Sequence, residues 1–139
     1  HPLVYNGDIR SVDDFKGLRE RLGNLRGWMI GRGAIADPFL PCALAAGGKI
    51  EKTPDALRAF HDDLYQKYCE ILFGPVSILG KMKELWFYLS QGFADGRGIL
   101  KKVRKSTRLE QYQRAVDSFF DSAPTLIELP STTLFSSRH

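Results

Sequence analysis

Two glycine turns near the start of the chain decide its interpretation: Leu3-Val4-Tyr5-Asn6-Gly7-Asp8 and Gly27-Trp28-Met29-Ile30-Gly31-Arg32-Gly33. In each, a brief apolar run that favours a strand stops at residues with turn chemistry. Between the turns, Ser11 is placed to cap a helix and Gly23 to end it. Apolar residues keep helical spacing in this interval: Phe15, Leu18 and Leu22. The order predicted is strand, helix, strand, and then a short helix from Ala34.

The two glycine turns are candidates for a phosphate site. Backbone N–H groups of glycine can approach an anion because no Cβ stands in the way. In TIM barrels the turns after strands 7 and 8 often bind phosphate, and Arg32 would add a positive charge. Alternatively, Gly7 and Gly31 serve tight turns only, and Asp8 stabilises its own turn. Two such turns in tandem favour the phosphate site.

The character of the sequence changes near residue 50. A flexible polar linker leads to Thr53-Pro54-Asp55, which reads as the start of a helix, and helical stripes of apolar residues follow. A whole TIM barrel needs about 250 residues, so the chain is too short to contain one. We expect an α/β fragment, the last two βα units of a TIM barrel, over residues 1–48. We expect an all-α helical bundle domain over residues 49–125 and an irregular tail over residues 126–139.

Positive charge is concentrated in one block of the chain. The formal net charge is +4, and residues 75–108 hold eight Lys and Arg against two Asp and Glu. Like charges this close repel one another and are easiest to explain if a phosphate backbone neutralises them. The alternative is a solvated helix face. The candidate RNA-binding residues are Lys81, Lys83, Arg97, Lys101, Lys102, Arg104, Lys105 and Arg108. Of these, four are predicted to share a helix face: Arg97, Lys101, Arg104 and Arg108.

Three consecutive aromatic residues, Trp86-Phe87-Tyr88, lie within the basic block. At least one of them should face outward, where it could stack on a base. We expect Trp86 to pack in the core along the apolar stripe of its helix.

Other residue types suggest little further chemistry. No second His or Cys stands at metal-ligand spacing from His61, so we expect no metal site. Cys42 and Cys69 are expected to be buried like small apolar residues, and two thiols without a leader sequence suggest a reducing cytoplasm. No apolar run approaches the roughly 18–20 residues of a membrane span. Because a strand-like run starts at Leu3, we expect the chain to begin inside a longer protein.

The motifs together resemble a known family. Tyr5-Asn6-Gly7-Asp8-Ile9, Met29-Ile30-Gly31-Arg32-Gly33-Ala34 and Ala36-Asp37-Pro38-Phe39 resemble the end of the barrel of tRNA-dihydrouridine synthases. The resemblance is specific over residues 3–40 and only architectural over residues 50–122, where that family carries a helical tRNA-binding domain.

The resemblance implies an FMN enzyme that uses NADPH to reduce a uridine in tRNA to dihydrouridine. It assigns the FMN phosphate to Asn6, Gly7, Asp8, Gly31 and Arg32. The family's acid cysteine lies upstream of the matched region, and neither cysteine of this chain fits its context. We therefore expect no catalytic residue in the chain and no turnover by it alone.

Partners follow from the same resemblance: tRNA, and the remaining N-terminal barrel of the same protein. If the chain is truly truncated, its exposed strands could instead be exchanged between copies in a homo-oligomer. Two alternative functions stay open. One is a stand-alone helical RNA-binding module, and the other is a different FMN-dependent TIM-barrel oxidoreductase, such as one like dihydroorotate dehydrogenase.

Overall fold

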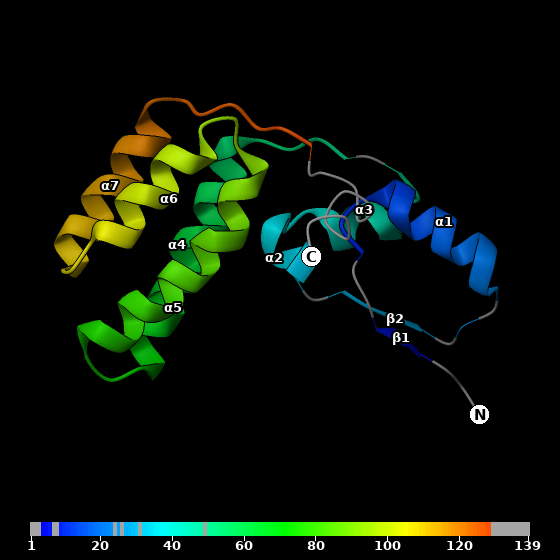
Figure 1. Ribbon diagram of the computed structural model, residues 1–139, viewed down its shortest axis with the longest axis horizontal. Helices are drawn as coiled ribbons and strands as arrows, with labels where there is room; N and C mark the ends of the chain where they lie inside the picture. The colour runs from blue at the N-terminus through cyan, green and yellow to red at the C-terminus, as the bar shows by residue number, and fades with distance from the viewer. Residues whose placement is uncertain are drawn as a thin grey trace. The chain divides into compact units, whose positions relative to one another are not determined.

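A computed structural model describes residues 4–6, 9–23, 25, 27–30, 32–48 and 50–128 (Figure 1). In chain order the elements are β1 (Val4–Asn6), α1 (Val12–Leu22), β2 (Gly27–Met29), α2 (Arg32–Ala36), α3 (Leu40–Ala45), α4 (Pro54–Ile71), α5 (Gly74–Leu89), a 3-10 turn η1 (Ser90–Gly92), α6 (Gly96–Lys105) and α7 (Leu109–Asp121). The chain forms two compact units. The second, the helical unit, spans Lys52–Ile127, and the first contains the described residues before it together with Glu128.

The first unit begins with a small parallel sheet. β1 and β2 pair in parallel with Asn6 opposite Met29, and α1 connects them (Figure 1). The predicted cap of α1 is confirmed, because the Ser11 hydroxyl accepts a hydrogen bond from the backbone N–H of Asp14 at 3.0 Å. The core of this unit is small, and its buried apolar residues include Ile9, Ala36, Leu40 and Ala43.

The segments after the two strands touch at Gly33. A Cβ at Gly33 would collide with the backbone carbonyl of Ile9, so only glycine fits there. Backbone that follows β1 therefore lies directly against the first turn of α2, which follows β2.

The prediction of an α/β TIM-barrel fragment is wrong. In the described part of the chain, the β structure amounts to two strands of three residues, and most of the other residues are helical. Barrel strands pair on both sides, whereas among the described residues β1 and β2 pair only with each other. The apolar runs near the two turns were read as strands of a large sheet. Runs of that length are too short to specify one.

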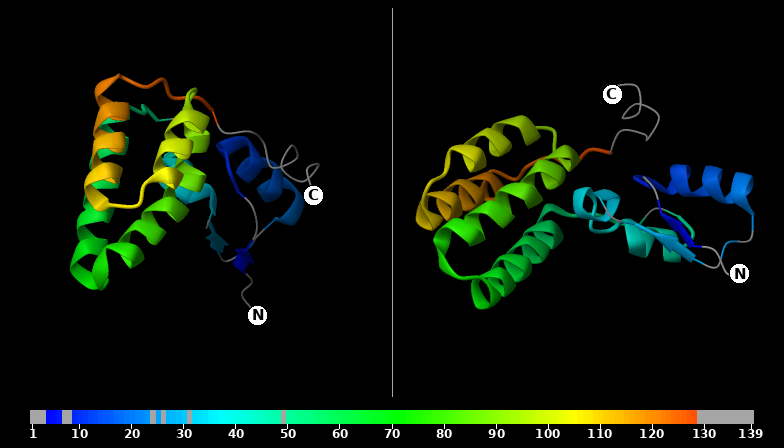
Figure 2. Two further views of the ribbon diagram at one scale, coloured as in Figure 1. Left: turned by 60° about the vertical axis from the view of Figure 1, so that its left-hand side comes forward. Right: turned by 60° about the horizontal axis from the view of Figure 1, so that its bottom comes forward.

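The helical unit agrees with the predicted helical bundle. Its four helices, α4 to α7, pack against one another, and α6 and α7 lie side by side in all views (Figures 1 and 2). The start of α4 is as predicted, because the Thr53 hydroxyl accepts from the backbone N–H of Ala56 at 3.1 Å. The chain leaving α7 returns to η1, where Leu126 bridges to Phe93.

Two local predictions in the helical unit need correction. α6 ends at Lys105, and Arg108 is the N-cap residue of α7, so Arg108 is not on the helix that carries Arg97 and Lys101. Thr107 and Glu110 have the spacing of a capping box, which predicts that Thr107 caps α7, but this box does not form. Instead, the side chain of Gln111 accepts from the backbone N–H of Thr107 at 3.0 Å.

Candidate nucleic-acid interface

Helix α6 has two sides of opposite character. Gly96, Ile99 and Val103 are buried on one side against the rest of the helical unit. Close approach of α6 to η1 requires Gly96, since a Cβ there would collide with the carbonyl of Ser90. The opposite side carries the cations. This arrangement follows from residue spacing, because positions three, four and seven apart share a helix face.

The structure places seven of the eight predicted RNA-binding residues at the surface. Arg97, Lys101 and Arg104 share the exposed side of α6, with Lys102 and Lys105 exposed beside them. We call these five residues the basic face. Lys81 and Arg108 are exposed, and Lys83 is half-buried. Among the described residues, only Lys81 of the eight forms an ion pair, with Glu84 at 3.5 Å. The basic face is therefore a concentration of charge without neutralising acids in the part of the chain described.

An aromatic side chain adjoins the basic face. The guanidinium carbon of Arg104 lies 5.7 Å from the ring centroid of Phe87 in α5, within the range of a cation–π contact. Phe87 is 47% exposed, whereas the preceding Trp86 is fully buried. The prediction that Trp86 belongs to the core and that a neighbouring aromatic faces outward is confirmed. The contact with Arg104 could not be read from the sequence.

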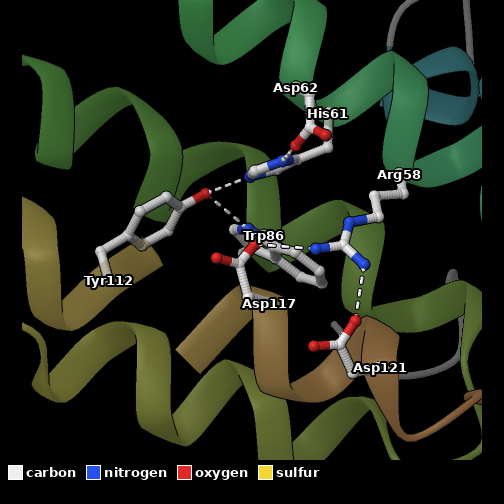
Figure 3. Close-up of polar contacts among 7 residues, drawn as sticks. All are labelled: Arg58, His61, Asp62, Trp86, Tyr112, Asp117 and Asp121. Atoms are coloured by element: carbon white, nitrogen blue, oxygen red, sulfur yellow. Dashed lines mark hydrogen bonds and ion pairs between the residues drawn. The ribbon is translucent and has the colours of Figure 1, made fainter. Parts of the chain in front are cut away.

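A buried polar network lies inside the helical unit (Figure 3). The Tyr112 hydroxyl is 2.6 Å from Nε2 of His61, and the indole N–H of Trp86 donates to the same oxygen at 2.8 Å. The other ring nitrogen of His61, Nδ1, is 2.9 Å from a carboxylate oxygen of Asp62. The network links α4, α5 and α7, and its three aromatic residues are almost completely buried.

Only one proton arrangement satisfies every group with a neutral imidazole. Trp86 donates to the Tyr112 oxygen, Tyr112 donates to Nε2 of His61, and Nδ1–H donates to Asp62. Burial lowers the pKa of His61, against a smaller opposing effect of Asp62. Burial also raises the pKa of Tyr112 far above its ordinary value. Both shifts favour the uncharged forms, so the network is a structural element and not a poised acid or base.

A pair of salt bridges on the outside of the helical unit joins α4 to α7, two of the three helices that the buried network links. Arg58 donates to Asp121 at 2.9 Å and to Asp117 at 3.0 Å, and its guanidinium also lies 5.7 Å from the ring centroid of Phe120 (Figure 3). Asp117 and Asp121 are one turn apart on α7, so both carboxylates can reach one guanidinium. Their partner in α4 was not predicted.

The residues that the resemblance assigns to the FMN phosphate fall mostly outside the described residues. Gly7, Asp8 and Gly31 are not described. Asn6 ends β1 and Arg32 begins α2, and for these two residues the structure describes only the backbone. The structure therefore leaves the FMN assignment as a prediction.

The expectation that both cysteines are buried is wrong, because Cys42 and Cys69 are exposed. Within the described ranges, no group of three or more His, Cys, Asp or Glu is arranged to hold a metal ion. None of the helices described combines the length and the apolar character that crossing a bilayer requires.

The features of the helical unit define a class: a compact helical module with a strongly basic, exposed helix face. No family model matches the chain. Over 109 residues the chain is 28% identical to the tRNA-dihydrouridine(16) synthase of Pseudomonas syringae pv. tomato. The match covers 76% of this chain and 34% of the relative, so the chain spans about a third of that protein's length. The similarity is distant and partial, and it agrees with the family suggested by the motifs.

Proposed function

We propose that this chain is part of a flavin-dependent tRNA-dihydrouridine synthase and that its helical unit binds tRNA. The observation that carries the RNA-binding part is the basic face, where five cations lie within one ten-residue helix without acid partners among the described residues. Phosphates of an RNA backbone would supply the missing negative charge. The reductase part is supported by the similarity to a tRNA-dihydrouridine synthase.

The test of RNA binding compares two matched pairs of charge removals. Lys101→Ala/Lys105→Ala removes two exposed cations from the basic face. Lys67→Ala/Arg114→Ala also removes two, but Lys67 is paired with Asp63 on α4, and Arg114 shares a face of α7 with three acids. The measurement is the affinity for unmodified tRNA as a function of salt concentration.

The two double variants should behave differently. Each cation that contacts a phosphate contributes about one unit to the slope of log affinity against log salt concentration. The basic-face pair should therefore lower the slope by about 2 and weaken binding at low salt. The control pair should leave the slope near its wild-type value. Equal slopes in all three proteins would remove the basic face from the interface.

The proposal includes FMN as cofactor and NADPH as reductant. FMN, when bound, would carry hydride from NADPH to the uracil ring. Its phosphate would be held at Asn6, Gly7, Asp8, Gly31 and Arg32. Support for an anion site comes from the parallel pairing of β1 with β2 and from the direct contact of Gly33 with Ile9, which bring the two segments together.

The reductase proposal is tested on the full-length protein that contains this chain. That protein should bind FMN, and unmodified tRNA should reoxidise its reduced flavin. A colourless protein that still binds tRNA would favour the alternative function, a stand-alone RNA-binding module. The helical unit is compact by itself, and this observation supports that alternative. A flavoprotein whose reduced flavin is not reoxidised by tRNA would favour the other alternative, a different FMN-dependent oxidoreductase.

A further inference from the structure

Phe87 is an exposed aromatic residue at the edge of a charged surface. Nearly half of its surface is open to solvent, although it follows a fully buried tryptophan on the same helix. Large apolar side chains scattered on a surface are common, so exposure alone indicates nothing. Phe87 differs from a scattered surface residue because it contacts both a cation, Arg104, and a second aromatic ring, Tyr88.

Two contacts restrict the position of the Phe87 ring. Arg104 lies over it at 5.7 Å, and the ring of Tyr88 meets it nearly at right angles, with centroids 5.0 Å apart. A side chain that is already restricted loses less conformational freedom when a ligand binds to it. The ring is therefore prepared to receive a flat partner on its open surface.

The charges around the ring are those of a nucleic-acid site. Lys83 lies one turn before Phe87 on α5, and Lys101 lies one turn before Arg104 on α6. The single acid of α5, Glu84, is already paired with Lys81. Cations that follow a phosphate backbone, together with an aromatic ring that stacks on a base, are the combination by which proteins bind unpaired nucleotides.

We propose that Phe87, held between Arg104 and Tyr88, is a stacking platform for an unpaired nucleobase of RNA bound at the basic face. This inference rests on the proposed RNA binding and specifies its target. A base inside a helix is already stacked on its neighbours, so the platform selects loops, bulges or single-stranded ends. Stacking tolerates any base, and Phe87 would therefore recognise an unpaired structure and not a sequence.

The experiment compares two RNAs with the same number of phosphates, a hairpin with an unpaired loop and a blunt duplex. Each is titrated with the 139-residue chain and with Phe87→Ala. The matched control is Phe73→Ala, since Phe73 is 98% exposed and has no cation beside it on α5. Phe87→Tyr keeps the ring and serves as the conservative variant.

Phe87→Ala should weaken binding of the hairpin about 5- to 150-fold, the range that corresponds to loss of one stacked base. Its affinity for the duplex should change less than about twofold. Phe87→Tyr and Phe73→Ala should bind both RNAs like the wild type. With 5-iodouridine in the loop, ultraviolet crosslinking should join the RNA to the peptide that contains Phe87.

Three results would overturn the stacking role. Unchanged hairpin affinity in Phe87→Ala would contradict the stacking role. Equal losses of affinity for the hairpin and the duplex would also contradict it, because they would indicate a change in the structure of the protein. A crosslink outside α5 and α6 would place the unpaired base elsewhere. In each of these cases wild-type binding to RNA persists and the proposed function stands. If the wild type binds neither RNA, the proposed function fails, and the platform fails with it.

Discussion

The hydroxyl of Tyr112 joins the buried network, and Tyr112→Phe removes that oxygen without removing carbon. The change leaves Trp86 without an acceptor for its indole N–H and His61 without a donor to Nε2. Each buried group without a partner costs about 1–3 kcal/mol. The variant also avoids burying a hydroxyl, which recovers part of that cost. We expect the free energy of unfolding of the helical unit to fall by about 2–4 kcal/mol.

The assay must report on the helical unit alone. The chain has two tryptophans, so a Trp28→Phe background leaves Trp86 as the only fluorophore, and it lies beside the altered group. Urea unfolding followed by Trp86 fluorescence gives the free energy directly. For a domain of this size each kcal/mol corresponds to roughly 4–8 °C, so the melting temperature should drop by roughly 8–32 °C.

Tyr88→Phe is the matched control for this measurement. Within the described structure the Tyr88 hydroxyl has no hydrogen-bond partner, so its removal should change stability by less than about 0.5 kcal/mol. If Tyr112→Phe were no more destabilising than Tyr88→Phe, the hydroxyl would not be holding the network, and the assignment of donors and acceptors would be wrong.

The remaining predictions concern charge, backbone and binding. Because burial lowers the pKa of His61 below its ordinary value of 6.5, its stabilising contribution is complete above pH 6.5 and is lost as pH falls through the lowered pKa. Urea titrations should therefore show stability falling as pH drops below about 6.5, with a flatter pH dependence in His61→Gln. Gly96→Ala should lower the melting temperature because its Cβ meets a backbone carbonyl, whereas Gly80→Ala, with open space around it, should stabilise by about 0.5–1 kcal/mol. Arg104→Lys should keep the salt dependence of RNA binding but weaken hairpin binding, because ammonium lacks the flat contact with Phe87; an unchanged hairpin affinity would contradict this.

Features that depend on a few neighbouring residues were predictable from the sequence. Ser11 and Thr53 cap their helices as expected, because a capping hydroxyl bonds to an N–H only three positions ahead. The core position of Trp86 followed from the apolar stripe of its helix. The same local reasoning produced errors where two local choices compete. Thr107 could have capped α7, but the helix begins at Leu109 with Arg108 as its N-cap residue.

Features that depend on distant residues could not be predicted. Arg58 and Asp121 are 63 positions apart, and His61 and Tyr112 are 51 positions apart. Which residues meet across such intervals is set by how the helices pack, and helical spacing gives only the face of each helix. The TIM-barrel prediction failed for a related reason. A run of three strand-favouring residues defines a strand but not the size of the sheet it joins.

Stability and the proposed RNA binding should be separable in the helical unit, because they depend on opposite sides of its helices. The network of Tyr112 lies in the core, while α6 contacts that core through Ile99 and Val103 and presents its cations outward. Electrostatic attraction to phosphates depends on the number of charges and is insensitive to small shifts of the helix. Stacking depends on the contact between Phe87 and Arg104, which belong to two different helices. At temperatures well below its melting point, Tyr112→Phe should therefore keep the salt dependence of the wild type. If Tyr112→Phe loses affinity for RNA, the loss should be confined to RNA with an unpaired loop. The reason is that a change in core packing would alter RNA binding only by moving α5 relative to α6.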